Sequence, residues 1–120
     1  MRTVADAMAE ALVTVEQAMT IQQASAAMLD AGVHAAVVVD RKKKARGVIT
    51  ADDIFRALAQ GYDAGETLVG AIAASDPLLA RPDEPLAEAH LRMRAEACAV
   101  AAVAGPHGEP LGLLEDHEAG

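Results

Sequence analysis

The chain has 120 residues, enough for one compact domain or for two small subdomains that share a core. A net charge of −8 and an aromatic content of 2% argue against nucleic acid as a partner, because phosphates are bound by basic surfaces and bases stack on aromatic rings. The single cysteine excludes an intrachain disulfide, and we expect neither a signal segment nor a membrane span, so the sequence predicts a cytoplasmic protein.

Apolar periodicity in the first half predicts elements in the order β-α-β-β-α, at residues 11–15, 21–31, 35–40, 47–50 and 52–60. The first helix carries Ile21, Ala24 and Met28 on one face, and Gly32 follows it as a C-cap. Gly61 stops the second helix. The parallel strands around the first helix require a right-handed crossover.

The second half repeats the first at an offset of 65 residues, without a gap. Met28 aligns with Met93 and Gly47 with Gly112, and these matches carry more weight than the alanines of an alanine-rich chain. The repeat predicts strands and a helix at residues 78–80, 86–96, 100–105 and 112–115, with Pro85 in the first turn of the helix. We therefore expect two copies, 1–65 and 66–120, of which the second is truncated in its closing helix.

The closing helix of the first copy has an apolar stripe, Ile54 and Leu58, without a counterpart in the second copy. Either residues 4–11 or another subunit should cover it. The core must be built from small aliphatic side chains, each of which buries little area at about 25 cal/mol per Å². We expect residues 4–11 to pack on the body of the domain, and the chain to form a homodimer.

The motifs "VADAM", "AGVHAAVVVD" and above all "GVITADDIFRAL" make the sequence similar to a tandem pair of CBS domains, also called a Bateman module. The resemblance covers nearly the whole chain. It implies an α/β (α+β) fold in which two β-α-β-β-α motifs pack through their sheets as a pseudo-twofold pair, usually within a disk-like dimer. It also implies a regulatory sensor of adenosine-containing ligands such as AMP, ADP, ATP, S-adenosylmethionine or sometimes NAD.

The resemblance also implies which residues bind that ligand. The family's pattern falls on Gly47, Val48, Ile49, Thr50 and Asp53. In relatives the acidic residue holds the ribose hydroxyls and the Ser/Thr helps to hold ribose or phosphate. We expect Val48 and Ile49 to floor a cleft between the copies. His34 lies where some relatives carry a basic residue that contacts phosphate.

Each of these residues also has an interpretation that needs no ligand. Thr50 and Asp53 resemble a capping box that starts a helix, and capping and ligand binding can hold together. His34 can be a partly exposed neutral imidazole. The second copy has Glu115 and Glu118 at the positions of Thr50 and Asp53, and a glutamate repels phosphate. We therefore expect one site per chain, for a neutral or monophosphate adenosine ligand.

Residues 41–46 contain five of the ten basic side chains. They can dock a phosphate or a partner, but a solvated hairpin turn is the favoured interpretation, because lysines remain readily in water.

The sequence predicts no enzyme and requires no cofactor. Cys98 precedes a buried strand as a small core residue, and no nucleophile–histidine–acid pattern is present. A metal could be held by His107, Glu115, His117 and Glu118, but these residues straddle a terminus that we expect to fray, and we expect no metal site.

Two functions remain open from the sequence. The first is a stand-alone regulatory module that binds an adenosine ligand and acts on an unidentified protein. The second is a dimerisation scaffold whose nucleotide site has degenerated.

Overall fold

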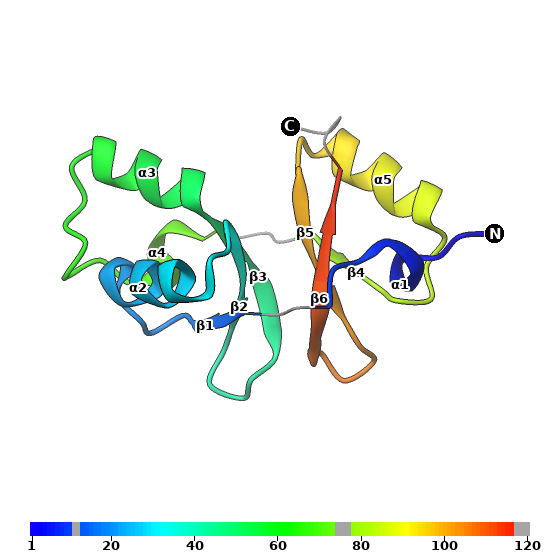
Figure 1. Cartoon of the computed structure of the whole chain (residues 1–120), viewed down its shortest axis with the longest axis horizontal. Helices are drawn as coiled ribbons and strands as arrows, with labels where there is room; N and C mark the ends of the chain where they lie inside the picture. Colours follow the sequence, from blue (N-terminus) through cyan, green and yellow to red (C-terminus); the bar gives the residue numbers. More distant parts are fainter. Residues whose placement is uncertain (11–12, 74–77, 117–120) are drawn as a thin grey trace.

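The computed structural model describes residues 1–10, 13–73 and 78–116, and it contains two three-stranded sheets, ordered β1-β2-β3 and β4-β5-β6 (Figure 1). The elements of the first copy and of the segment after it are α1 (Val4–Ala7), β1 (Thr14–Glu16), α2 (Ile21–Ala31), β2 (Ala35–Val39), β3 (Ala45–Thr50), α3 (Ala51–Ala59) and α4 (Val69–Ile72). Those that follow are β4 (Leu79–Ala80), α5 (Leu86–Ala95), β5 (Val100–Ala104) and β6 (Pro110–Glu115).

The two sheets have the same topology, which confirms the predicted α/β (α+β) class and the repeat. In each, the first strand runs parallel to the second and the second runs antiparallel to the third. The pairing register of each hairpin also shifts at the equivalent place, between Val38 and Val39 in one sheet and between Val103 and Ala104 in the other. The first strand begins at Thr14, later than predicted; residues 11 and 12 lie outside the described residues.

Local sequence accounts for the helix ends. Thr20 caps α2 by accepting the amide of Gln23, and Gly32 ends this helix at φ 68°, as predicted. Pro85 is the N-cap of α5, one position earlier than predicted, and it offers no side-chain cap. The first amide of α5, that of Leu86, instead donates to the carbonyl of Arg2 at 3.0 Å.

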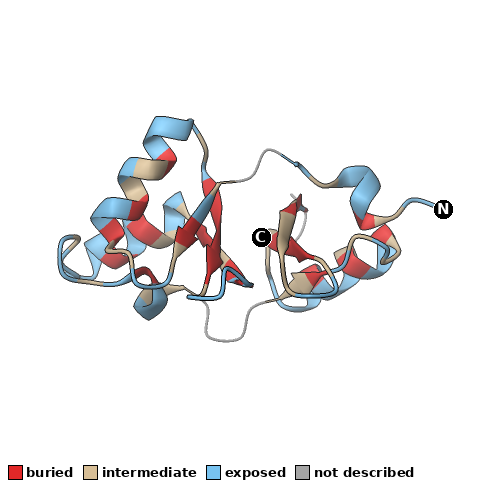
Figure 2. Cartoon of the chain, turned by 90° about the horizontal axis from the view of Figure 1, so that it is seen from below, coloured by how far each residue is buried: buried red, intermediate tan, exposed pale blue. Residues whose placement is uncertain are grey.

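The sheets face each other at the centre and the helices lie outside, so the molecule has four layers (Figure 1). Buried residues concentrate on the strands (Figure 2). The cluster between the sheets consists of small aliphatic residues, Val37, Val39, Ala45, Ala102 and Ala104. Side chains of this size let the two sheets approach closely, but they contribute little buried area each.

The short helices α1 and α4 are exchanged between the copies. Val4 of α1 is fully buried in the core of the second sheet, while Val69 of α4 is fully buried in the core of the first. The amide of Val4 donates to the backbone carbonyl of Glu84 at 2.9 Å, and the amide of Val69 donates to the backbone carbonyl of Met19 at 2.8 Å. Each valine buries a side chain worth about 1.5–3 kcal/mol, so the exchange ties the two halves together.

This exchange bears on two predictions for residues 4–11. As expected, residues 4–10 pack on the body of the domain, where Ala9 bridges to Leu113; residue 11 lies outside the described residues. They do not cover the apolar stripe of α3, because they pack on the other sheet. Ile54 of that stripe is buried in the first core instead, and Leu58 stays 46% exposed.

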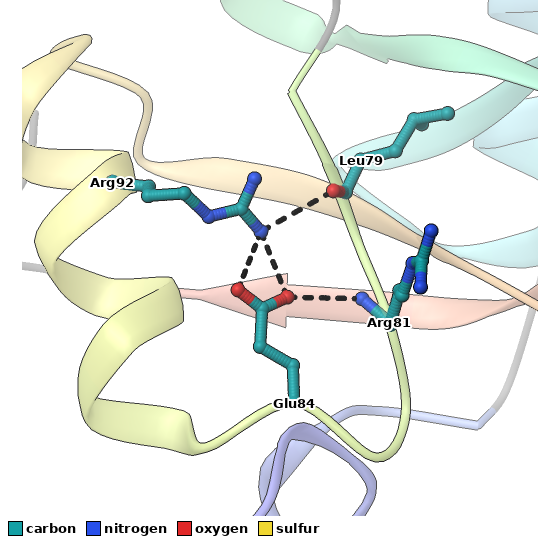
Figure 3. A network of polar contacts seen from close by, with 4 residues as sticks. All are labelled: Leu79, Arg81, Glu84 and Arg92. Atoms are coloured by element: carbon teal, nitrogen blue, oxygen red, sulfur yellow. Dashed lines mark hydrogen bonds and ion pairs between the residues drawn. The ribbon is translucent and has the colours of Figure 1, made fainter.

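A polar network fixes the start of the second copy (Figure 3). One guanidinium nitrogen of Arg92 on α5 lies 2.7 Å from both carboxylate oxygens of Glu84 and 3.4 Å from the carbonyl of Leu79. The same carboxylate accepts the amide of Arg81 at 3.1 Å. The network joins α5 to β4 and to the loop between them, although its partly exposed ion pair contributes modestly to stability.

The hairpin turns of the two copies share a left-handed backbone at one pair of equivalent residues, although the residue type differs. Lys43 in the first turn and Gly108 in the second both have left-handed backbones, at φ 66° and 82°. Glycine adopts this conformation freely, whereas a residue with a side chain loses roughly 1–2 kcal/mol. The first turn therefore carries a backbone strain that the second avoids.

No helix within the described ranges is both long enough and apolar enough to cross a membrane.

The packing of residues 4–10 requires a glycine in β6. A Cβ added to Gly112 would lie 2.5 Å from the carbonyl oxygen of Ala9. We expect Gly112→Ala to lower the free energy of unfolding by about 1–3 kcal/mol, measured by urea denaturation. Gly65→Ala is the control, since its Cβ would meet nothing closer than 3.4 Å. Equal effects of the two substitutions would contradict the packing described for residues 4–10.

Candidate functional site

A cleft of about 720 Å³ lies between the two copies, where α3 and β5 begin. The wall from the first copy includes His34, Val48, Thr50, Asp52, Asp53 and Arg56. The facing wall includes Leu78, Glu96, Cys98, Val100 and Glu115. Neither copy forms the cleft alone, so its shape depends on how the two copies pack.

The capping box predicted at the start of α3 is present. The amide of Asp53 donates to Thr50 Oγ1 at 3.1 Å, and the amide of Thr50 donates to Asp53 Oδ2 at 2.9 Å. The second carboxylate oxygen, Oδ1, accepts no hydrogen bond from the described residues and lies 3.6 Å from Arg56 Nη1. The cap therefore uses one oxygen of Asp53 and leaves the other at the cleft.

The two apolar residues before Thr50 do not both reach the cleft. Val48 lines it, whereas Ile49 is fully buried in the first core. Successive side chains of a strand point to opposite faces, so Thr50 and Val48 share the cleft face of β3 and Ile49 points to the helices. This corrects the expectation that Ile49 floors the cleft.

His34 lies on the rim of the first wall with an exposed side chain. Its carbonyl accepts the amide of Ala51 at 2.8 Å, which ties the start of β2 to the start of α3. Ala99 has the same position in the second copy, where its carbonyl accepts the amide of Asp116 at 2.9 Å. The backbone role is thus shared by both copies, but the imidazole is found in only one.

Cys98 on the facing wall is a protonated thiol. Its Sγ–H donates to the carbonyl of Val100 at 3.0 Å. Burial raises the pKa of the Cys98 thiol, and the negative charges of Glu96 and Asp53 raise it further. A thiol of this kind is a poor nucleophile at neutral pH.

Acidic side chains outnumber basic ones around the cleft. Among the described residues, its lining contains four carboxylates, from Asp52, Asp53, Glu96 and Glu115, and one guanidinium, from Arg56. Such a lining repels a chain of phosphates and tolerates an uncharged or cationic group.

Sequence reasoning missed Arg56, Glu96 and Cys98 as cleft residues. The spacing of three residues between Asp53 and Arg56 could have revealed the first, because residues at i and i+3 share a helix face. Glu96 and Cys98 reach the cleft only through the packing of the second copy on the first, which no local pattern reports.

The described residues contain no group of three or more histidine, cysteine or acidic side chains placed to hold a metal. His117 and Glu118, two of the four ligands considered from the sequence, lie outside the described ranges.

Known proteins share the sequence pattern and the fold described above. Residues 4–60 match the family model of the CBS domain. A CBS-domain protein from Pyrobaculum aerophilum, PAE2072, solved with AMP, superposes with a TM-score of 0.84 at 24% identity, covering 95% of this chain and 87% of that one. The chain has the fold of a tandem CBS-domain pair. This confirms the resemblance seen in its motifs.

Two further solved structures share the CBS-pair fold. The CBS-domain pair of protein MJ0100, in complex with 5′-methylthioadenosine and S-adenosyl-L-methionine, has a TM-score of 0.82 at 22% identity, covering 95% of this chain and 89% of that one. The cytosolic domain of the Mg²⁺ channel MgtE, in complex with ATP, has a TM-score of 0.80 at 21% identity, covering 94% and 45%.

A curated relative contains a segment similar to this chain within a longer protein. Homoserine O-acetyltransferase from Methanosalsum zhilinae is 28% identical over 116 residues, which are 97% of this chain and 23% of that protein. The chain thus spans about a quarter of the length of the curated relative it matches.

Proposed function

We propose that the chain is a cytoplasmic regulatory module, not an enzyme, that binds an adenosine-containing ligand in the cleft between its two CBS copies. The observation that carries this proposal is the capping box of α3, which leaves Oδ1 of Asp53 at a cleft of about 720 Å³ built by both copies. The ligands in the structures of PAE2072, MJ0100 and MgtE support the ligand class.

Four residues of the first wall have a role in ligand binding under this proposal. Asp53 Oδ1 would accept hydrogen bonds from the two ribose hydroxyls, since a carboxylate matches a vicinal diol. Thr50 Oγ1 already accepts the Asp53 amide, so its hydroxyl hydrogen remains to donate to ribose or to a first phosphate. Val48 would contact the base or ribose as an apolar floor, and His34 would assist from the rim.

The charges of the cleft determine the form of ligand. The amino end of α3 and Arg56 favour one anionic group, provided that Arg56 leaves Asp53. The described lining has four carboxylates and one guanidinium, so a triphosphate would be poorly neutralised. The proposed ligand is therefore an uncharged adenosine compound, an adenosyl sulfonium such as S-adenosylmethionine, or AMP.

Regulation would follow from the position of the ligand between the copies. A ligand that touches Thr50 on one wall and the start of β5 on the other favours the arrangement of the two sheets that fits both contacts. A protein attached to or docked on the module would then respond to this arrangement.

The role of Asp53 is testable by ligand-induced thermal shift. A ligand at 100 times its dissociation constant should stabilise the wild type by about 2.7 kcal/mol. Asp53→Ala should abolish the shift while costing only about 1 kcal/mol of capping stability. A bound ligand should also slow alkylation of Cys98, which lines the facing wall.

Asp6→Ala is the matched control, because Asp6 accepts the Thr3 amide at 2.9 Å just as Asp53 accepts that of Thr50, but on α1 and away from the cleft. It should keep the ligand-induced shift. If no adenosine compound raises the melting temperature at millimolar concentration, the ligand proposal fails and the scaffold alternative stands.

The acidic lining predicts an order of affinity. Adenosine, 5′-methylthioadenosine and AMP should bind more tightly than ATP, by about tenfold or more, because the additional phosphates face a lining that has more carboxylates than cations among the described residues. Glu96→Gln should narrow this difference, as measured by isothermal titration calorimetry. Glu66→Gln changes the net charge equally outside the lining of the cleft and should leave the difference unchanged. ATP binding as tightly as AMP to the wild type would refute the predicted order.

We further propose that the chain forms a homodimer through the exposed face of α3. Phe55 is 75% exposed and Leu58 46% exposed, three residues apart on one helix, and Tyr62 follows just beyond the helix with 49% exposure. Large apolar side chains that gather in this way are typical of a protein–protein interface. A twofold contact would cover the same stripe on both subunits.

Analytical ultracentrifugation tests this contact. At high micromolar concentration the wild type should sediment at about twice its 12.4 kDa mass. The double variant Phe55→Glu/Leu58→Glu should sediment as a monomer, since a twofold contact would oppose the new carboxylates. Leu91→Glu changes a leucine on α5 that is 64% exposed, and this variant should remain dimeric. Sedimentation of the wild type as a monomer would refute the proposed dimer.

A further inference from the structure

A second charged feature lies at the end of the β2–β3 hairpin that is opposite the cleft. The basic turn, residues 41–46, joins β2 to β3 and contains Arg41, Lys42, Lys43, Lys44 and Arg46. It lies at the end of the hairpin opposite the start of α3 (Figure 1). Since the whole chain has ten basic and 18 acidic side chains, half of its positive charge is gathered in this one turn.

The basic turn is a structured element. Asp40 Oδ1 accepts the amides of Lys42 and Lys44 at 2.9 and 3.1 Å, and Oδ2 accepts Arg46 Nε at 2.8 Å. The Lys44 amide is the main cause that lowers the pKa of Asp40, so this carboxylate stays charged at neutral pH. The amide of Ala45 donates to the carbonyl of Gly108 at 2.7 Å, which fastens the turn to the hairpin of the other copy.

One lysine of the turn has a backbone conformation that glycine adopts with less strain. Lys43 has a left-handed backbone where the second copy has Gly108. Its side chain is 71% exposed, and its ion pair with Glu16 is largely exposed as well, so these contacts offset little of the strain. Strained backbones in folded proteins often mark functional positions. The fold alone therefore does not account for a lysine at residue 43.

Three charges of the turn have no ion-pair partner within the part of the chain that the structure describes. Glu16 and Asp40 pair with Lys43 and Arg46. The side chains of Arg41, Lys42 and Lys44 are exposed and form no ion pair with any carboxylate in the described ranges.

We propose that the basic turn is a docking site for an acidic segment of a partner protein. A short carboxylate-rich segment can contact the turn alone, where three cations are available within a Debye length of about 8 Å. An extended polyanion would also approach the remainder of the chain, which carries 18 acidic and five basic side chains and would repel it. This inference does not depend on ligand binding in the cleft.

The test uses the full chain and a fluorescein-labelled peptide of ten glutamates, with binding measured by fluorescence anisotropy at low salt. The double variant Arg41→Gln/Lys42→Gln should bind the peptide about tenfold more weakly, since two exposed ionic contacts are lost. Arg2→Gln/Arg81→Gln removes the same net charge from exposed sites outside the turn and should bind as the wild type does. Equal losses in the two variants would overturn the proposal.

Lys43→Gly separates recognition from folding. It relieves the left-handed strain, so its melting temperature should equal or exceed that of the wild type, while peptide binding should weaken. Unchanged peptide binding would overturn the role assigned to Lys43. The proposal also fails if duplex DNA or phosphatidylserine vesicles bind the wild type more tightly than the peptide does and lose that binding in Arg41→Gln/Lys42→Gln.

Discussion

The contact between the two sheets is the constraint on which the other features depend. Small side chains such as Val37 and Ala102 bring the sheets together over the middle of the molecule, and the cleft is the space left where α3 and β5 begin. That contact buries little area per residue, so it would hold two separate halves weakly. The exchange of Val4 and Val69 between the cores adds a further connection, because each valine anchors a segment of one copy in the core of the other.

The features that the sequence could predict are those determined by neighbours in the chain. The helix at Ile21–Ala31 and its C-cap at Gly32 follow from periodicity and from one glycine. The cap formed by Thr50 and Asp53 follows from two residues three positions apart. The exchange of α1 and α4 could not be predicted, since Val4 and Val69 are equivalent in the repeat and either could pack on either sheet. Cys98 and Glu96 were missed for the same reason, because they reach the cleft only through the packing of one copy on the other.

The two copies share one strand topology but carry different side chains at the end of the third strand. In the first copy Ala51 begins a helix that Thr50 and Asp53 cap. In the second copy the residue equivalent to Ala51 is Asp116, only 6% exposed, whose carboxylate forms an ion pair with Arg94 at 2.9 Å. The buried carboxylate is thus committed to a contact with α5. The same position that helps to start a helix beside the cleft in one copy stabilises the fold in the other.

The hairpin of β2 and β3 connects the two sites proposed for this chain. Strand β3 begins at Ala45, within the basic turn, and ends at Thr50, the cap of α3, so the six residues of this strand span about 20 Å and link the two sites. A strand is too stiff to transmit a gradual distortion over that length, but it can move as a body relative to the facing sheet. Ala45 is bonded to Gly108 of the second copy at one end of β3, and the cleft is shared with the second copy at the other. A change in how the sheets meet would therefore alter both sites at once. If ligand and partner favour different arrangements of the sheets, each must change the affinity for the other by the same factor, because coupling between binding sites is reciprocal.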